Sequence, residues 1–288
     1  DRLALKASFA TTMQPVHLLT TGGGLGLPAD LWVPATDRVG PQRGWQAALG
    51  AAGSVGTTTS WTVDGYWREM RGLVAYREGA AFTSPFDDWQ DLVETGEGRS
   101  FGVEVFVQHR TDRLTAWAGY TWSKTDRQFD GIDGGRRFPF RYDRRHDVSL
   151  TARYRLSDRF DISGGFVYGT GDAVTLPEAT YQAPAYGYGD LAGWVRPFDD
   201  FDVTDQTAYG DRNGFRLPAY ARLDLGASWH FRRGPRPRAL HLNVYNATNR
   251  KNPFMTSLEQ GNGFGSRRQL TGLALFPVLP TLSYQFSF

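Results

Sequence analysis

The sequence predicts an all-β fold, a transmembrane antiparallel up-and-down β-barrel of which residues 1–288 form one segment of about ten strands. Three observations lead to this prediction. Segments of about ten residues with alternating apolar and polar side chains recur along the chain, and this is the length and period of a tilted membrane strand. The links between these segments alternate between short and long. The last segment ends on an aromatic residue, Phe288.

The strand pattern is clearest in the final segment, where Tyr284, Phe286 and Phe288 share one face opposite small polar side chains. Segments 147–156 and 221–231 repeat it with their charged side chains confined to one face. A slip of one residue would turn those charges toward lipid, at about 2–4 kcal/mol for an arginine near the midplane, so the register is strongly fixed. Further strands are expected at 2–12, 43–53, 59–72, 102–108, 113–124, 159–170 and 238–246.

The links differ in length in a regular order. Short links are expected at 110–113, 157–159 and 232–238, and long links at 13–42, 73–98, 125–143, 171–216 and 247–269. Short turns on one side and long loops on the other are typical of outer-membrane barrels, where the turns face the periplasm and the loops face the exterior. Aromatic residues near both ends of the strands fit the two belts at the head-group levels.

Composition and motifs exclude several classes of protein. With 32 Lys and Arg against 30 Asp and Glu, the chain has no basic excess for a nucleic-acid partner. It contains no cysteine, which removes disulfides and thiolate metal sites. No HExxH, GxSxG or phosphate-loop motif is present, so we expect neither an enzyme nor a cofactor. No apolar run approaches the roughly 20 residues of a membrane helix.

A dense charged patch stands where a long link enters segment 147–156. Its alternate members fall on the polar face, which we expect to line the barrel lumen. There they could form lateral charge pairs with residues of neighbouring strands. The predicted lumen charge network comprises Glu104, Asp143, Arg145, Asp147, Arg153, Arg222 and Asp224. The alternative interpretation of the patch is contact with a substrate or with lipopolysaccharide.

Long links in compact proteins are often functional, and the longest one here, 171–216, is rich in aromatic and acidic residues. Aromatic rings can stack on ligands, and closely spaced carboxylates can hold Ca²⁺. The candidate ligand-binding residues of the links are Trp32, Tyr181, Tyr186, Tyr188 and Trp194. Weak calcium candidates are Asp199, Asp200, Asp202 and Asp205, although the spacing lacks the glycine and distal glutamate of an EF-hand. A solvated loop is the alternative.

Pieces spread over most of the chain resemble the C-terminal half of TonB-dependent outer-membrane receptors. They are QPVHLL and LPADLWVP within 14–34, GYWREMRGLVAYREGA at 65–80, GRSFGVEVFVQ at 98–108, WAGYTWSKTDRQF at 117–129, RYDRRHDVSL at 141–150, LPAYARLDLGASWHF at 217–231 and LNVYNATNRKNPF at 242–254. The resemblance implies a bacterial outer-membrane transporter that imports a scarce nutrient when TonB, using the proton-motive force, opens a plug. It also implies that Tyr284, Phe286 and Phe288 form the signal read by the barrel-assembly machinery.

The sequence departs from that family in two respects. Family members carry a plug and a TonB box, neither of which is found here, and their barrels have twenty-two strands. We therefore expect about the last ten strands of such a barrel, with strands 2–12 and 280–288 paired by another chain or an unseen segment, because open edges are not tolerated in hydrocarbon. Pairing of these two strands with each other would instead indicate a small closed barrel.

The expected partners follow from this resemblance. They are the outer-membrane lipids and lipopolysaccharide, the missing barrel strands and plug, TonB through that plug, and a surface lipoprotein. A passive porin, or a structural barrel in an envelope complex, is the alternative function.

Overall fold

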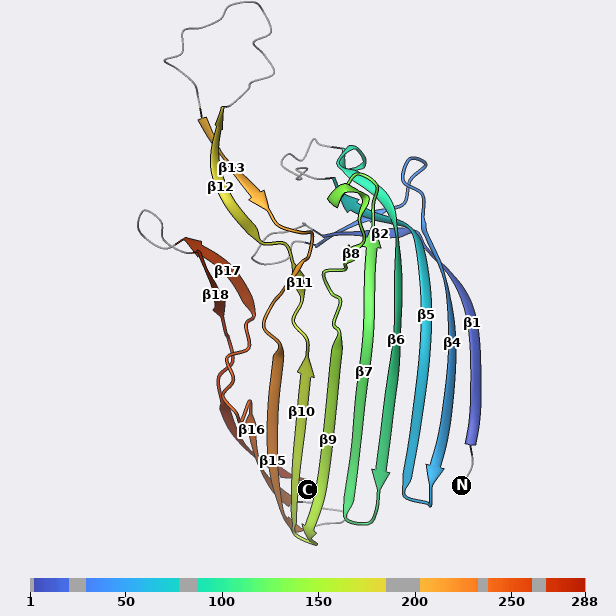
Figure 1. Ribbon diagram of the computed structural model, residues 1–288. Helices are drawn as coiled ribbons and strands as arrows, with labels where there is room; N and C mark the ends of the chain where they lie inside the picture. The colour runs from blue at the N-terminus through green and yellow to red at the C-terminus, as the bar shows by residue number, and fades with distance from the viewer. Residues whose placement is uncertain are drawn as a thin grey trace, which may run out of the picture.

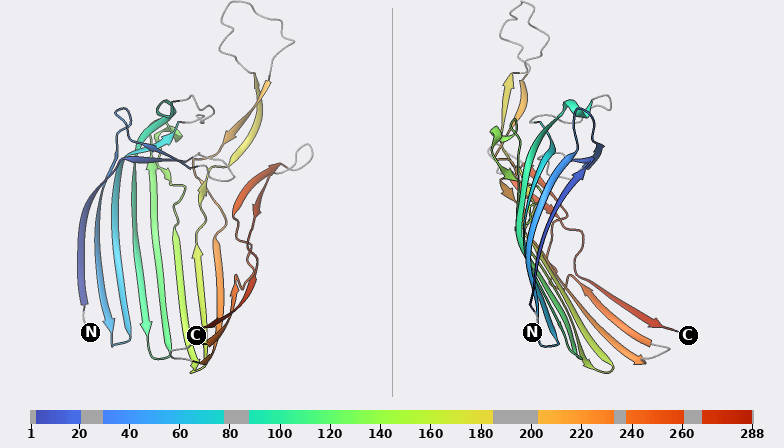
Figure 2. Two further views of the ribbon diagram at one scale, coloured as in Figure 1. Left: turned by 180° about the vertical axis from the view of Figure 1, so that it is seen from behind. Right: turned by 90° about the vertical axis from the view of Figure 1, so that its right-hand side faces the viewer.

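The computed structural model describes residues 3–20, 30–77, 88–184, 203–232, 238–260 and 268–287. Its main body is one antiparallel sheet in which ten strands follow each other in the order β1-β4-β5-β6-β7-β9-β10-β15-β16-β19, with the short strand β8 paired to β7. Each long strand is therefore hydrogen-bonded to the next long strand along the chain. The sheet bends across its width into an arc (Figure 1 and Figure 2). No helix of the described residues is long and apolar enough to cross a membrane.

The prediction of about ten strands is confirmed. The long strands are β1 (Leu3–Gln14), β4 (Gln42–Val55), β5 (Thr59–Tyr76), β6 (Val93–Arg110), β7 (Leu114–Gln128), β9 (His146–Ser157), β10 (Phe160–Gly169), β15 (Tyr220–Arg232), β16 (Arg238–Tyr245) and β19 (Leu279–Phe286). Strands β5 and β6 extend beyond their expected ends because their pairing continues past a bulge at Gly72, where φ is +68°. Glycine adopts this left-handed conformation at little cost.

The alternation of link lengths is confirmed as well. Tight turns join β4 to β5, β6 to β7 and β9 to β10 at one end of the sheet, and the long links gather at the opposite end (Figure 1). The long links contain the hairpins β2 (Val16–Thr20) with β3 (Asp30–Pro34), β12 (Pro177–Pro184) with β13 (Val203–Tyr209), and β17 (Met255–Gln260) with β18 (Arg268–Leu273). They also contain β8 (Phe138–Pro139), the pair β11 (Ala173–Val174) and β14 (Phe215–Arg216), and the 3-10 turns η1 (Trp89–Asp91) and η2 (Asp133–Gly135).

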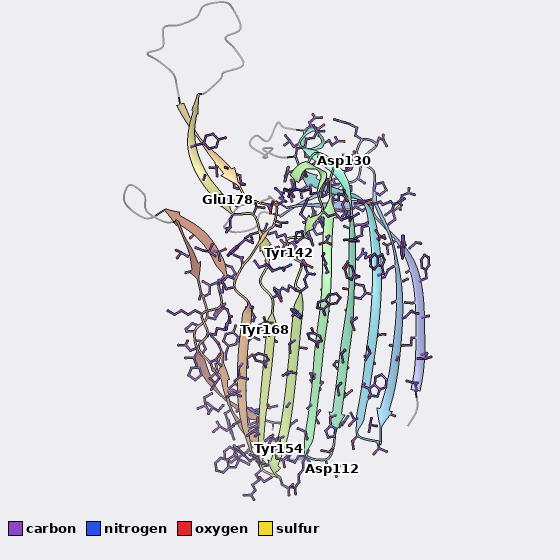
Figure 3. All side chains as sticks on the ribbon, in the orientation of Figure 1. Asp112, Asp130, Tyr142, Tyr154, Tyr168 and Glu178 are labelled. Atoms are coloured by element: carbon purple, nitrogen blue, oxygen red, sulfur yellow. The ribbon has the colours of Figure 1, made fainter. Side chains whose placement is uncertain are left out.

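The register gives the sheet two distinct faces. Between β7 and β9, Ala118 pairs with Leu150 on one face, and Thr121 pairs with Asp147 on the other. Because directly paired residues share a face, this division continues from strand to strand. We call the first side the apolar face and the second the polar face. Figure 3 shows the side chains along these strands, with Tyr154 of the apolar face near the tight turns and Tyr168 of the same face nearer the long links.

Hydrophobic side chains on the apolar face are widely exposed, as on the edge strands, where Leu5 is 80% and Leu282 is 68% exposed. The buried hydrophobic residues lie mainly at the long-link end, in two clusters. One cluster comprises Leu19, Val33, Val39, Val74, Tyr76 and Val93, and the other comprises Leu73, Phe129, Ile132 and Phe138. The first fixes hairpin β2–β3 and the second fixes the link between β7 and β9 onto the strand ends. The sheet itself therefore needs an apolar medium, whereas the links have small cores of their own.

The edge strands of the sheet are β1 and β19. Within the described residues β1 pairs only with β4, and β19 pairs only with β16. The two edges lie well apart in the side view of Figure 2. The described strands therefore form an open arc and not a small closed barrel.

Candidate functional site

The polar face carries a line of charge across the first strands. Lys6 Nζ lies 3.0 Å from Asp64 Oδ1, although β4 runs between their two strands. The residue of β4 opposite both is Gly50, and a Cβ there would lie 1.9 Å from Asp64 Oδ1. The absent side chain thus lets the ion pair cross a whole strand. Glu104 of the predicted network stands directly opposite Asp64 on β6.

Asp143 is the centre of the strongest charge cluster, at the long-link end of the sheet. Its carboxylate is fully buried, accepts a 2.6 Å hydrogen bond from the Thr125 backbone N–H, and pairs with Arg145 at 3.1 Å. It also pairs with Arg216 of β14, whose guanidinium donates in addition to the Asp143 carbonyl. This cluster ties the link before β9 to the end of the link before β15. Its burial fits the interpretation of the patch as lateral charge pairs.

Arg222 and Asp224 form a second cluster at the upper end of β15. The Arg222 side chain donates to Asp224 at 2.9 Å, and it also donates to the hydroxyl groups of Tyr220 and Tyr245. The other Asp224 oxygen accepts a 2.9 Å bond from the backbone N–H of Asn246. Asn246 has φ of +50° and donates its amide to two carbonyls of the link that follows β16. The cluster thus sets the point at which that link leaves the sheet.

A third cluster lies near the tight turns and was only partly predicted. Asp161 of β10, 2% exposed, pairs with Arg153 at 2.6 Å and with His230 Nε2 at 2.7 Å. Arg155 lies 4.0 Å away and directly opposite Asp161 in the hairpin register. The alternation of charged and apolar residues places Arg155 and Asp161 on one face of a hairpin, so their proximity could have been inferred from the sequence, although a bulge between Phe160 and Asp161 sets the register. The approach of His230 from β15 could not have been inferred, because the position of β15 along the sheet depends on the long link before it.

The seven residues of the predicted charge network therefore occupy several places. The structure brings together Asp143 with Arg145, and Arg222 with Asp224, but Arg153 pairs with Asp161 near the opposite end of the sheet. Asp147 lies 3.9 Å from Arg144, and Glu104 faces Asp64. Sequence reasoning missed Arg216, which reaches Asp143 across 73 residues, and no local pattern identifies it.

Two of the candidate ligand-binding aromatic residues lie in described hairpins. Trp32 of β3 is 60% exposed and Tyr181 of β12 is 55% exposed. Tyr186, Tyr188 and Trp194 lie outside the described residues, as do the calcium candidates Asp199, Asp200 and Asp202. Asp205 lies in β13, paired with Gln182. The described residues contain no group of three or more His, Cys, Asp and Glu side chains placed to hold a metal ion.

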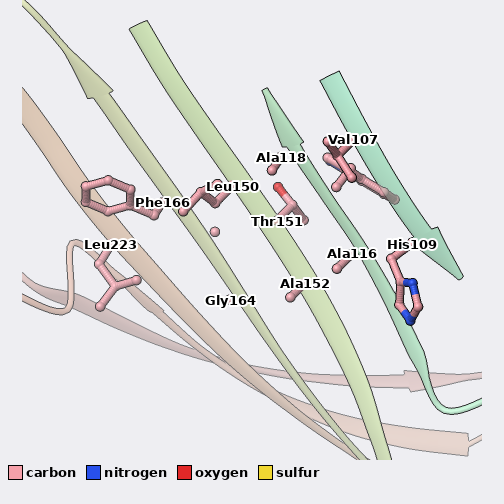
Figure 4. A pocket seen from close by; sticks show the side chains of 12 residues that line it. Val107, His109, Ala116, Ala118, Leu150, Thr151, Ala152, Gly164, Phe166 and Leu223 are labelled. Carbon is pink, nitrogen blue, oxygen red and sulfur yellow. The ribbon is translucent and has the colours of Figure 1, made fainter. Parts of the chain in front are cut away.

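The apolar face has a shallow hollow of about 390 Å³ near the middle of the sheet (Figure 4). Small residues, Ala118, Ala152 and Gly164, form its floor, and Leu150 and Phe166 are among its bulkier walls. Its lining is almost wholly apolar, and His109 and Thr151 are among its few polar residues, so it offers a ligand few orienting groups. Such a surface suits hydrocarbon chains and not a polar substrate.

The residues of the expected assembly signal lie on the edge strand. Tyr284 pairs with Leu240, and Phe286 with Arg238, and both aromatic side chains are more than half exposed. The Tyr284 and Phe286 rings stack, with centroids 5.8 Å apart. Phe288 lies outside the described residues.

The structure is an all-β sheet with an apolar face, an ion-paired polar face and links that alternate between short and long. The family comparison agrees with this fold. The family model for the TonB dependent receptor-like β-barrel matches residues 1–247. The chain belongs to the TonB-dependent receptor family. The apolar face of this receptor barrel is therefore the outward, lipid-facing side in the bacterial outer membrane, and the polar face lines the lumen.

Solved receptor structures share the fold of this TonB-dependent receptor chain. The ferripyoverdine receptor of the outer membrane of Pseudomonas aeruginosa superimposes with a TM-score of 0.55 at 14% identity, covering 99% of this chain and 31% of that one. The ferric preacinetobactin receptor BauA from Acinetobacter baumannii superimposes with a TM-score of 0.55 at 15% identity, covering 100% of this chain and 34% of that one. The ferric-catecholate import receptor Fiu from E. coli superimposes with a TM-score of 0.52 at 15% identity, covering 98% of this chain and 33% of that one. The chain thus spans about a third of their length. Curated protein sequences give no match.

Proposed function

We propose that this chain forms part of the barrel wall of a transporter that imports a scarce nutrient through a lumen closed by a plug, which TonB displaces. The observation that carries this proposal is the polar face, which presents charged side chains from β1 to β15. Lys6, Asp64 and Asp161 stand on it with their partners. Side chains of this kind suit a lumen that holds water or a polar domain, and not lipid.

The edges of the arc support a larger barrel. Strands β1 and β19 each have one side without a described partner. Unpaired amides and carbonyls are not tolerated in hydrocarbon, so further strands must pair with both edges. Barrels of twenty-two strands have a lumen wide enough to contain a plug. The proposal therefore requires a plug and additional strands, whichever chain supplies them.

The long links are the proposed region of nutrient binding. Their hydrophobic clusters and the buried Asp143 hold them at fixed positions above the sheet. Trp32 and Tyr181 project from separate hairpins with most of their surface free. Iron chelates are one candidate class of substrate, because the receptors with similar structures are ferric-chelate receptors, and oligosaccharides are another.

Uptake measurements test the proposal. Cells that express the complete receptor containing this chain are given labelled ferric chelates or labelled oligosaccharides, and uptake is compared in strains with and without functional TonB. We expect one class of solute to accumulate only when TonB and the proton-motive force are present. Uptake that persists at the same rate without TonB would contradict the proposal and favour a passive porin.

A further inference from the structure

A second hollow lies on the apolar face, at the long-link end of β1, β4 and β5. It measures about 580 Å³ and differs from the first in being partly polar. Its lining residues are Thr11, Thr12, Met13, Arg43, Gly44, Trp45, Glu69 and Arg71. Since the long links face the cell exterior, this hollow opens toward the outer leaflet of the membrane.

Two arginines define the hollow. Arg43 of β4 stands directly opposite Arg71 of β5, and both side chains are exposed. Like charges placed directly opposite each other on a sheet repel. Among the residues that the structure describes, neither guanidinium has an ion pair with a carboxylate. Two cations therefore stand side by side without an ion pair among the described residues, and one carboxylate, that of Glu69, shares the hollow with them.

The two carboxylates closest to this pair in the sheet register have other partners. Glu69 accepts a 2.8 Å hydrogen bond from Trp67 Nε1. Glu97 stands opposite Arg71 on β6 but forms its ion pair with Arg137. Farther along the same rim the arrangement differs, because Asp126 lies within 3.4 Å of both Arg99 and Lys124. The two arginines of the hollow therefore lack the direct carboxylate contact that Arg99 and Lys124 have, and the described lining of the hollow carries an excess of positive charge.

The height of the pair in the membrane follows from the rings beneath it. A row of aromatic side chains crosses the apolar face there, with Phe9 against Trp45 at 6.0 Å and Trp67 against Phe101 at 5.0 Å between ring centroids. Such rows mark the boundary between hydrocarbon and head groups. Arg43 is two residues beyond Trp45, which places it roughly 7 Å farther outward. All charged side chains on the apolar face of β1, β4 and β5 line the hollow.

We propose that Arg43 and Arg71 bind a phosphate group of lipopolysaccharide, whose phosphorylated acylated anchor forms the outer leaflet. Two guanidinium forks can hold one phosphate through several charge-assisted hydrogen bonds. Bound phosphate would remove the repulsion between the cations, while the hydroxyl of Thr11, which shares the face of Trp45, offers a further donor. Trp45 and Met13 provide apolar walls for the attached sugar and acyl chains. This site uses the lipid-facing side of the barrel and is independent of the transported nutrient.

Native mass spectrometry of the complete receptor in detergent tests the site, with bisphosphorylated lipid A as the probe. Arginines beside an anionic lipid surface strengthen binding about five-fold each, so R43A/R71A is expected to weaken lipid A binding about 25-fold. R43K/R71K keeps the charges and is expected to lose only a few-fold, because a lysine lacks the planar fork. Lipid A without phosphates should bind the unmodified receptor as weakly as intact lipid A binds R43A/R71A.

The matched control is R110A/R113A, which removes two exposed arginines at the tight turn between β6 and β7. It lies at the periplasmic end and should bind lipid A like the unmodified receptor. Unheated gel mobility of each variant shows that the barrel has folded. Unchanged lipid A binding by R43A/R71A, or an equal loss in the control, would overturn the proposal. Equal binding of inorganic phosphate alone would also overturn it, by showing a simple anion site that does not recognise lipid.

Discussion

Removal of the Asp143 carboxylate is expected to release the link before β9 from β14 without unfolding the barrel. In D143A the guanidinium groups of Arg145 and Arg216 lose their shared anion, and the Thr125 N–H loses its acceptor. Breaking a buried ion pair by removing one partner costs about 3–5 kcal/mol. Both arginine side chains are roughly a quarter exposed, so water relieves part of that loss. We therefore expect about 3 kcal/mol, or a hundredfold shift toward the detached state.

Hydrogen exchange of the complete receptor measures this opening, on peptides that cover 140–145 and 213–217. The matched control is D211A, because Asp211 joins the same two links through Arg136 but is 73% exposed. We expect no measurable change in exchange for D211A, since exposed ion pairs contribute little. The reasoning would be refuted if D143A exchanged like the unmodified receptor, or if D211A opened the links to the same extent.

Three further predictions concern the sheet, a buried histidine and the last strand. G50A should lower the yield of folded barrel on unheated gels, because its Cβ would collide with Asp64, whereas G40A, with open space around it, should not. Burial lowers the pKa of His17 below its ordinary 6.5, so the packing of β2 should be fully stable above pH 6.5 and weaken as the pH falls below it. Hydrogen exchange of 16–19 at pH 5 and 7.5 tests this, and H17Q should remove the difference. F286S should reduce the assembled barrel several-fold in membrane fractions, if the terminal aromatic residues are read during assembly, and S283A on the opposite face should not.

The strand pattern could be predicted because it depends on neighbours in the sequence. In a membrane strand every second residue meets lipid, so the alternation around Leu150 and Leu282 had to appear in the chain itself. Turn lengths are equally local and bring Arg155 near Asp161, although a bulge between Phe160 and Asp161 sets which residues pair. The extension of β5 past Gly72 was not predicted, because the alternation of apolar and polar residues breaks there. The pairing with β6 nevertheless continues beyond the break through a bulge.

The charge clusters show where sequence reasoning ends. The amino-acid sequence by itself determined the strands, their two faces, the alternation of the links and the family, since each is encoded in local spacing and in short motifs. Only the tertiary structure decided which charges meet. Asp143 meets Arg216 across 73 residues, and His230 of β15 meets Asp161 across 69, because the folding of long links sets those distances. An ion pair depends on a few ångströms in space, and residue spacing along the chain does not specify that distance once a long link intervenes.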